Sequence, residues 1–206
     1  MTANSTQNST NNPTSNPLLD PTGLPCNAPD FNKIQDEHII SAYKEASADF
    51  TNGAAAVAEN SAPATFENTI YALELAQVRF NKVHTFFDAL SGADMTNNRQ
   101  NIKKTVMPLV EQAHGDVYQN AQLFARVKTV AESNSLTTAL TTEQQRLTDD
   151  YVKTFIQNGV HLTQEQQQQL TALKTAISTG RSTFAEKALA QDEASALLVD
   201  TAEELA

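Results

Sequence analysis

An apolar stripe with helical spacing constrains this chain more than any other feature of its sequence. Apolar residues recur every three or four positions at Phe66, Ile70, Leu73, Ala76, Phe80, Val83, Phe87 and Leu90. Such a stripe covers one face of a helix, and that face must be buried against a partner helix. The stripe therefore predicts a long core helix that follows Pro63, has Thr65 as its N-cap, and ends near Gly92.

Similar patterns predict helices on both sides of this stripe. An earlier helix begins near Asp36 and fades near Gly53 or Asn60. A later helical region covers residues 97–132. We expect Pro108 to kink or break this later region, because proline lacks the N–H that a helix interior needs.

The last third of the chain predicts two more helices and a short strand. One helix begins near Thr142 and ends before Gly159. The other begins at a capping box formed by Thr163 and Gln166. Its expected buried residues are Leu170, Leu173, Ile177, Phe184 and Ala188, with Gly180 on the same face. Residues 197–199 favour a strand for which the sequence offers no partner. The predicted fold class is therefore all-α, an antiparallel bundle of long helices with one short strand near the C-terminus.

The N-terminal part of the chain does not follow this helical pattern. Residues 1–16 are mostly Asn, Ser and Thr, and we expect this leader to be disordered. Residues 17–35 contain repeated prolines, which favour an extended arm over a helix. The arm also carries large apolar residues, so we expect it to lie against another surface. Residues 36–206 then form the helical lobe.

The charge and composition of the chain exclude several classes of partner. Its net charge of −10 argues against binding to nucleic acids and to anionic membranes. No apolar run approaches the roughly 20 residues of a membrane-spanning helix. Cys26 is the only cysteine, so no disulfide can form within the chain. A cytoplasmic location is expected, or a periplasmic one if a signal peptide has been removed.

The sequence offers no recognisable catalytic, cofactor-binding or metal-binding residues. The four histidines are His38, His84, His114 and His161, and no two lie four residues apart as in an H-E-x-x-H zinc site. Cys26 has no histidine nearby in sequence to activate it. Asp149 and Asp150 would point roughly 100° apart on a helix. Glu203 and Glu204 form a second adjacent pair. All of these residues are expected to lie at the surface or at helix ends.

Several stretches of the chain, in order, match a known family of enzymes. They are Asn16-Pro-Leu-Leu19, residues 24–34 with Asp36-Glu-His-Ile-Ile40, residues 64–74, Leu123-Phe-Ala-Arg-Val127 and Gln145-Arg-Leu147. These stretches resemble the N-terminal half of the thimet oligopeptidase-like zinc metallopeptidases. Their peptidyl-dipeptidase (Dcp) branch is the most similar, and oligopeptidase A is a near relative. The most specific stretch is Thr-Phe-Glu-Asn-Thr-Ile at residues 65–70.

The resemblance implies that this chain is the N-terminal helical lobe of a longer peptidase. Members of the family hold zinc with an H-E-x-x-H helix and a later Glu in their C-terminal half. Neither element is present here, so zinc would belong to the parent enzyme and no site residue carries over. In the parent, this lobe would form one wall of a channel that admits peptides. The partners would be the catalytic C-terminal part and the peptides, from whose C-termini dipeptides are released.

Two other interpretations remain open from the sequence. The chain could be a stand-alone helical domain that binds peptides or a protein partner, or an unrelated helical scaffold. If it is a truncated lobe, we expect the arm and the strand at 197–199 to need cover from residues beyond Ala206. In their absence these segments would be loosely held, or a homodimer would form through the exposed edges.

Overall fold

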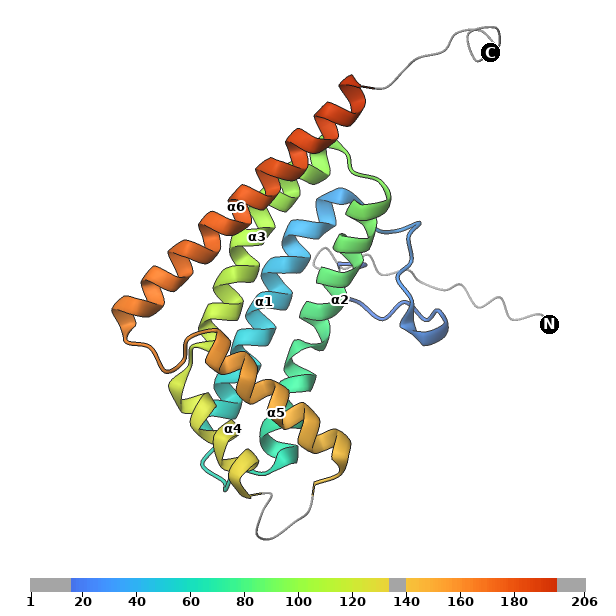
Figure 1. The fold of residues 1–206 in the computed structure, drawn as a ribbon. Helices are drawn as coiled ribbons and strands as arrows, with labels where there is room; N and C mark the ends of the chain where they lie inside the picture. The colour runs from blue at the N-terminus through green and yellow to red at the C-terminus, as the bar shows by residue number, and fades with distance from the viewer. Residues whose placement is uncertain (1–15, 134–139, 196–206) are drawn as a thin grey trace, which may run out of the picture. The chain divides into compact units, whose positions relative to one another are not determined.

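The computed structural model describes residues 16–133 and 140–195, and this part of the chain contains helices and no strand (Figure 1). The all-α prediction is therefore confirmed, while the strand predicted at 197–199 lies outside the described residues. The chain divides into a first unit, residues 1–161, and a second unit, residues 162–206. Within the described residues, no helix has the length and apolar character needed to cross a membrane.

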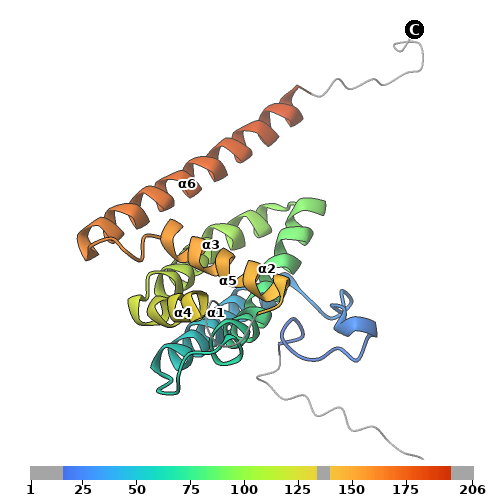
Figure 2. The ribbon, with the colours of Figure 1, turned by 60° about the horizontal axis from the view of Figure 1, so that its bottom comes forward.

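The first unit is a bundle of helices joined by short connections. Its elements are η1 (Pro25–Asn27), α1 (Asp36–Glu59), η2 (Phe66–Tyr71), α2 (Ala72–Ala93), α3 (Asn97–Tyr118), α4 (Ala121–Ser133) and α5 (Thr142–Gln157). Helix α1 packs between α2 and α3; α2 runs antiparallel to it, and α3 runs parallel to it (Figures 1 and 2). Helices α4 and α5 pack on each other and on η2 at one end of this layer.

The apolar stripe of the long second helix forms the centre of the core, as predicted. Ile70, Leu73, Phe80, Val83 and Phe87 are buried. Phe80 stacks on Phe50 of α1, with ring centroids 5.3 Å apart. The predicted N-cap is also confirmed, because the Thr65 hydroxyl accepts a hydrogen bond from the Asn68 N–H. The first turn, η2, is a π-helix that continues directly into α2.

The predicted break at Pro108 is wrong. Helix α3 runs through Pro108 without interruption and ends at Tyr118. Pro108 is exposed, so the backbone groups freed by its missing N–H face water. Val106 and Val110, on either side of it, are buried and hold both halves of α3 on the core. The break comes instead before α4, where the Asn120 side chain accepts a hydrogen bond from the Leu123 N–H.

The arm is less extended and better anchored than expected. It contains turns and η1, and Leu18, Leu19 and Ile34 are buried in the core of this chain. Asn16, expected in the leader, is itself buried and donates hydrogen bonds to the carbonyl of His38 (2.8 Å) and to Ser41 (3.0 Å). The expectation that the arm needs cover from residues beyond Ala206 is therefore wrong for Leu18, Leu19 and Ile34, whereas Leu24 and Phe31 are exposed as expected.

The second unit contains α6 (Gln164–Ala194), which begins at the predicted capping box of Thr163 and Gln166. The apolar face predicted to be buried is not buried: Leu173, Ile177 and Phe184 are 62%, 54% and 75% exposed. A Cβ placed on Gly180 would meet nothing within 4 Å. The spacing predicted the helix correctly, but the described part of this unit has no second element on which that face could pack.

Helices α1 and α2 approach closely at Gly53, which leads to a first prediction. A Cβ built on Gly53 would lie 2.6 Å from the Cβ of Ala76. Gly53→Ala should therefore lower the free energy of unfolding by about 1–3 kcal/mol through overpacking. In Gly115→Ala the new Cβ meets nothing within 4 Å, and the change should raise stability by about 0.5–1 kcal/mol. Urea denaturation of both variants checks these opposite signs, and two stabilising substitutions would contradict the close approach.

Candidate functional site

The four histidines do not form a cluster, and most of them contact other side chains or backbone groups of the chain. His38 lies at the start of α1, where its Nδ1 accepts a hydrogen bond from the Gln35 N–H (2.9 Å). His84 Nδ1 lies 3.0 Å from the hydroxyl of Tyr43. His114 packs among aromatic rings, and His161 is exposed at the end of the first unit. No group of three or more His, Cys, Asp or Glu side chains that could hold a metal ion occurs within residues 16–133 and 140–195.

The other candidate residues are not brought together either. Cys26 is exposed in η1. Asp149 and Asp150 are exposed on α5, where Asp150 forms an ion pair with Lys153 (3.2 Å). The pair at residues 203–204 lies outside the described part of the chain. These residues provide no catalytic constellation.

A polar cluster that the sequence analysis missed joins α2, α3 and α5. The hydroxyl of Tyr151 donates to Glu74 Oε1 at 2.7 Å, and Gln77 Nε2 contacts both groups, at 3.0 Å from Glu74 and 2.9 Å from the Tyr151 oxygen. Tyr118 donates a longer hydrogen bond of 3.5 Å to Gln77. Burial, together with the charge of Glu74, raises the pKa of Tyr118 to about 12. The cluster satisfies buried polar groups and acts as a cross-link between helices.

Residues 65–70, the stretch most specific to the family, include side chains that form structural hydrogen bonds. Arg126 of α4 donates to the carbonyls of Asn60 (2.6 Å) and Ala62 (2.9 Å) and to Asn68 Oδ1 (3.0 Å). Asn68 Nδ2 in turn donates to the carbonyl of Pro63 at 2.9 Å. Arg126 and Asn68 thus hold the linker between α1 and η2 in place. The motif therefore has a structural role in this chain.

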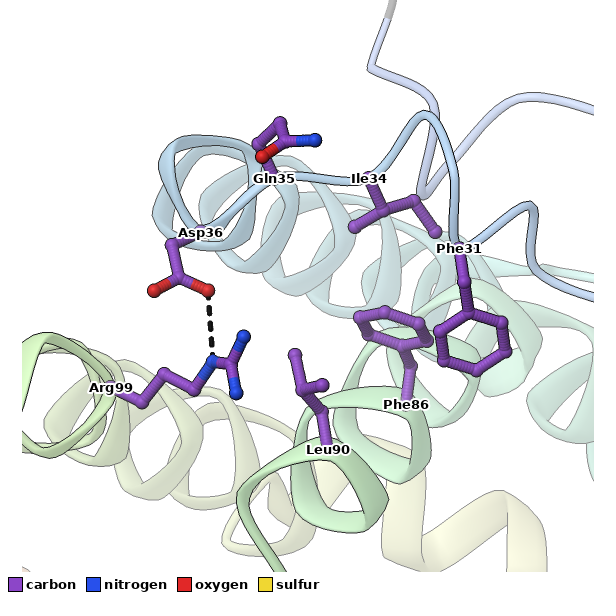
Figure 3. A pocket seen from close by; sticks show the side chains of 7 residues that line it. All are labelled: Phe31, Ile34, Gln35, Asp36, Phe86, Leu90 and Arg99. Atoms are coloured by element: carbon purple, nitrogen blue, oxygen red, sulfur yellow. Dashed lines mark hydrogen bonds and ion pairs between the residues drawn. The ribbon is translucent and has the colours of Figure 1, made fainter. Parts of the chain in front are cut away.

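A pocket with one apolar and one polar wall is the best candidate for a binding site (Figure 3). It has a volume of about 330 Å³ and lies where the arm meets α1, α2 and α3. The lining residues are Phe31, Ile34, Gln35, Asp36, Phe86, Leu90 and Arg99. The rings of Phe31 and Phe86 form one wall, with centroids 5.3 Å apart. The exposed surface of the pocket is more polar than apolar, so polar groups beside the apolar wall would fix the orientation of a ligand.

Arg99 organises the polar wall of this pocket. Its Nε donates to Asp36 at 2.9 Å, and its Nη1 donates to the carboxylate and to the backbone carbonyl of Asp94, both at 2.7 Å. Burial alone would raise the pKa of Asp36, but hydrogen bonds from Arg99 and Asn98 outweigh it and lower that pKa below its usual value. Asp36 is therefore a stable carboxylate at neutral pH. No signal in the sequence joined Asp36 to Arg99, which lie 63 positions apart.

Comparison of the sequence with known proteins shows that this chain is similar to part of several peptidases. The chain is 32% identical over 184 residues to a dipeptidyl carboxypeptidase of Salmonella typhimurium, a match that covers 89% of this chain and 27% of the relative. Dipeptidyl carboxypeptidase of Escherichia coli is 30% identical with the same coverage, and oligopeptidase A of Escherichia coli is 24% identical over 154 residues, 75% of this chain and 22% of the relative. No protein-family model matches the chain. The chain spans about a quarter of the length of these relatives, and the resemblance found in its sequence is confirmed.

Proposed function

We propose that this chain, a homologue of part of the dipeptidyl carboxypeptidases, is the N-terminal helical lobe of a zinc-dependent peptidyl-dipeptidase. The observation that carries the proposal is the extent of the match, which includes 89% of this chain but only 27% of the relative. In the parent enzyme the lobe would form one wall of the peptide channel. The rest of the enzyme would supply zinc and the catalytic groups, and would release dipeptides from peptide C-termini.

The arrangement of the first unit supports a role as a wall. Its helices are joined by interactions far apart in sequence, such as those of Arg79 of α2 with Glu45 (2.8 Å) and with Asp49 of α1. The Tyr151–Glu74 hydrogen bond does the same between α5 and α2. A rigid helical layer of this kind can position a channel surface without contributing a reacting group. The proposed partners are the catalytic remainder of the enzyme and the peptides in its channel, and the proposed location is the cytoplasm.

The chain alone should neither hold stoichiometric zinc nor cleave peptides. The expected test is release of the C-terminal dipeptide from an N-acetylated tetrapeptide, followed by mass spectrometry, with metal analysis of the same sample. A chimera in which this chain replaces the matched segment of the Salmonella enzyme should release the dipeptide. The proposal fails if the isolated chain is active, or if it holds one zinc that is lost on mutating His38 or His161. A folded chimera without activity would count against the lobe assignment.

The pocket beside Arg99 favours a second candidate function, a stand-alone domain that binds a peptide or a protein partner. It has an exposed aromatic ring, Phe31, at 65% exposure, which is the kind of residue found in binding surfaces. The reading frame after Ala206 distinguishes the two candidates, since an H-E-x-x-H motif there supports the peptidase lobe. A homodimer through residues 197–199 stays a prediction, and light scattering of the purified chain tests it.

A further inference from the structure

The pocket at the junction of the arm, α1, α2 and α3 has the chemistry of a site for an apolar side chain. Phe86 is 6% exposed and forms a fixed part of the apolar wall, while Phe31 is 65% exposed and stands beside it. Figure 3 shows the two rings side by side, with Leu90 and Ile34 continuing the apolar surface. Burying a large apolar side chain on such a surface is favourable at about 25 cal/mol per Å² of area removed from water.

Arg99 offers a hydrogen-bond donor on the opposite side of the pocket. Its Nε and Nη1 are used by Asp36 and Asp94, whereas its Nη2 has no hydrogen-bond partner among the described residues. In Figure 3 the guanidinium group reaches from α3 toward the space between Asp36 and Leu90. The two carboxylates already more than balance the single positive charge of Arg99. A neutral acceptor such as a peptide carbonyl therefore fits better than a further carboxylate.

The charges next to the pocket favour a positive group on the ligand. Asp94 is 69% exposed and Asp36 is 25% exposed at their side chains, and both face Arg99. Glu37, the next residue in the first turn of α1, is 81% exposed at its side chain. Two carboxylates thus face one guanidinium, and an exposed third, Glu37, follows Asp36 in the chain, whose net charge is −10. Electrostatic complementarity then selects a ligand with Lys or Arg near the apolar residue.

We propose that this pocket binds an extended peptide segment with a large apolar residue followed by Lys or Arg. The apolar side chain lies against Phe31, Phe86 and Leu90, and a backbone carbonyl of the segment accepts a hydrogen bond from Arg99 Nη2. The basic side chain lies near Asp94. This inference rests on the second candidate function, which it makes specific; every residue of the site belongs to this chain, so it does not depend on the catalytic remainder or on zinc.

Nuclear magnetic resonance of the ¹⁵N-labelled full chain tests the proposal with three capped peptides, acetyl-Gly-Phe-Lys-Gly-amide and versions with Glu for Lys or Ala for Phe. The Phe-Lys peptide should cause saturable shifts at Leu90, at the arm and at the Arg99 Nε–H, with a Kd on the order of 1 mM or tighter. The Phe-Glu peptide should bind at least about fivefold more weakly at low salt, and the difference should shrink as salt is added. The Ala peptide should cause no saturable shift.

Two matched variants distinguish binding in this pocket from nonspecific binding to apolar residues of the arm. Phe31→Ala removes an exposed lining ring and should weaken binding of the Phe-Lys peptide about tenfold. Leu24→Ala removes an apolar side chain of the same arm that is 43% exposed and does not line the pocket, so binding should not change. Equal effects of the two variants, equal binding of the Lys and Glu peptides, or saturable shifts confined to other helices would each overturn the proposal.

Discussion

Replacing Phe80 with alanine is expected to lower the free energy of unfolding by about 3–5 kcal/mol, the cost of deleting a fully buried aromatic side chain. Phe80 is 2% exposed and lies at the centre of the first unit. Its ring packs on Phe50 (5.3 Å), His114 (5.4 Å) and His84 (6.3 Å), measured between ring centroids. The substitution would leave a cavity lined by three rings from α1, α2 and α3, which cannot close without moving a helix.

Urea denaturation followed by far-ultraviolet circular dichroism measures this loss. A domain with a stability of only about 5–15 kcal/mol could be partly unfolded by it, so Phe80→Leu provides a milder second variant. Phe184→Ala, at a side chain that is 75% exposed on α6, is the control and should change stability by no more than about 0.5 kcal/mol. Similar losses at Phe80 and Phe184 would show that the core is not where the structure places it.

Those parts of the fold that depend on residues close in sequence were predictable. The spacing from Phe66 to Leu90 identifies a buried helix face whatever its partner, because the helical period alone brings these side chains together. The caps at Thr65 and Thr163 were equally local, since each involves the third residue that follows. The prediction of helices and their ends therefore succeeded where a few residues close in sequence determine the local structure.

Features that depend on the environment of an element were not predictable in the same way. Whether Pro108 breaks α3 depends on which side of the helix faces water, and it faces water here. Leu173 and Ile177 have core spacing, yet burial also requires a partner surface, and the second unit has none among its described residues. The arm was expected to need outside cover because nothing in its sequence shows that Leu18 fits the core of the same chain.

The candidate site could not be predicted from the sequence for the same reason. Asp36 and Arg99 are 63 positions apart, and Glu74 and Tyr151 are 77 positions apart. Neither pair forms a motif with fixed spacing, so only the packing of the helices brings them together. The resemblance to peptidases, in contrast, was readable because it depends on ordered local stretches such as residues 65–70. The sequence therefore indicated the relatives of the chain but not its pocket.

The second large effect is expected at high pH, from two buried tyrosines, Tyr43 and Tyr151, and the half-buried Tyr118. Tyr43 and Tyr151 are 0% and 6% exposed, and burial raises the pKa of each phenol above its usual value. The nearby charge of Asp88 raises the pKa of Tyr43 further. The hydrogen bond to Glu74 raises the pKa of Tyr151 further. Burial likewise raises the pKa of Tyr118 to about 12. In the unfolded chain all three phenols titrate near pH 10.

The sign of the effect follows from these differences. Between pH 10 and the raised pKa values, the unfolded state loses phenol protons that the folded state keeps. The free energy of unfolding therefore falls as pH rises. Each retained proton contributes a slope of about 1.4 kcal/mol per pH unit, so three give about 4 kcal/mol per unit. Below pH 10 both states hold these protons, and the stabilisation is fully present. We expect the first unit to unfold cooperatively between about pH 10.5 and 12.

Absorbance near 295 nm reports tyrosinate directly, because the chain has four tyrosines and no tryptophan. Most of the absorbance change should coincide with the loss of helical circular dichroism. Tyr118→Phe removes one phenol with a raised pKa and only a 3.5 Å hydrogen bond to Gln77, so it should move the alkaline midpoint to higher pH. Tyr71→Phe removes a phenol that is 53% exposed, leaves the buried ones in place, and serves as the control. If instead all four phenols ionised while the helices stayed intact, Tyr43 and Tyr151 could not be buried in the core as the structure shows.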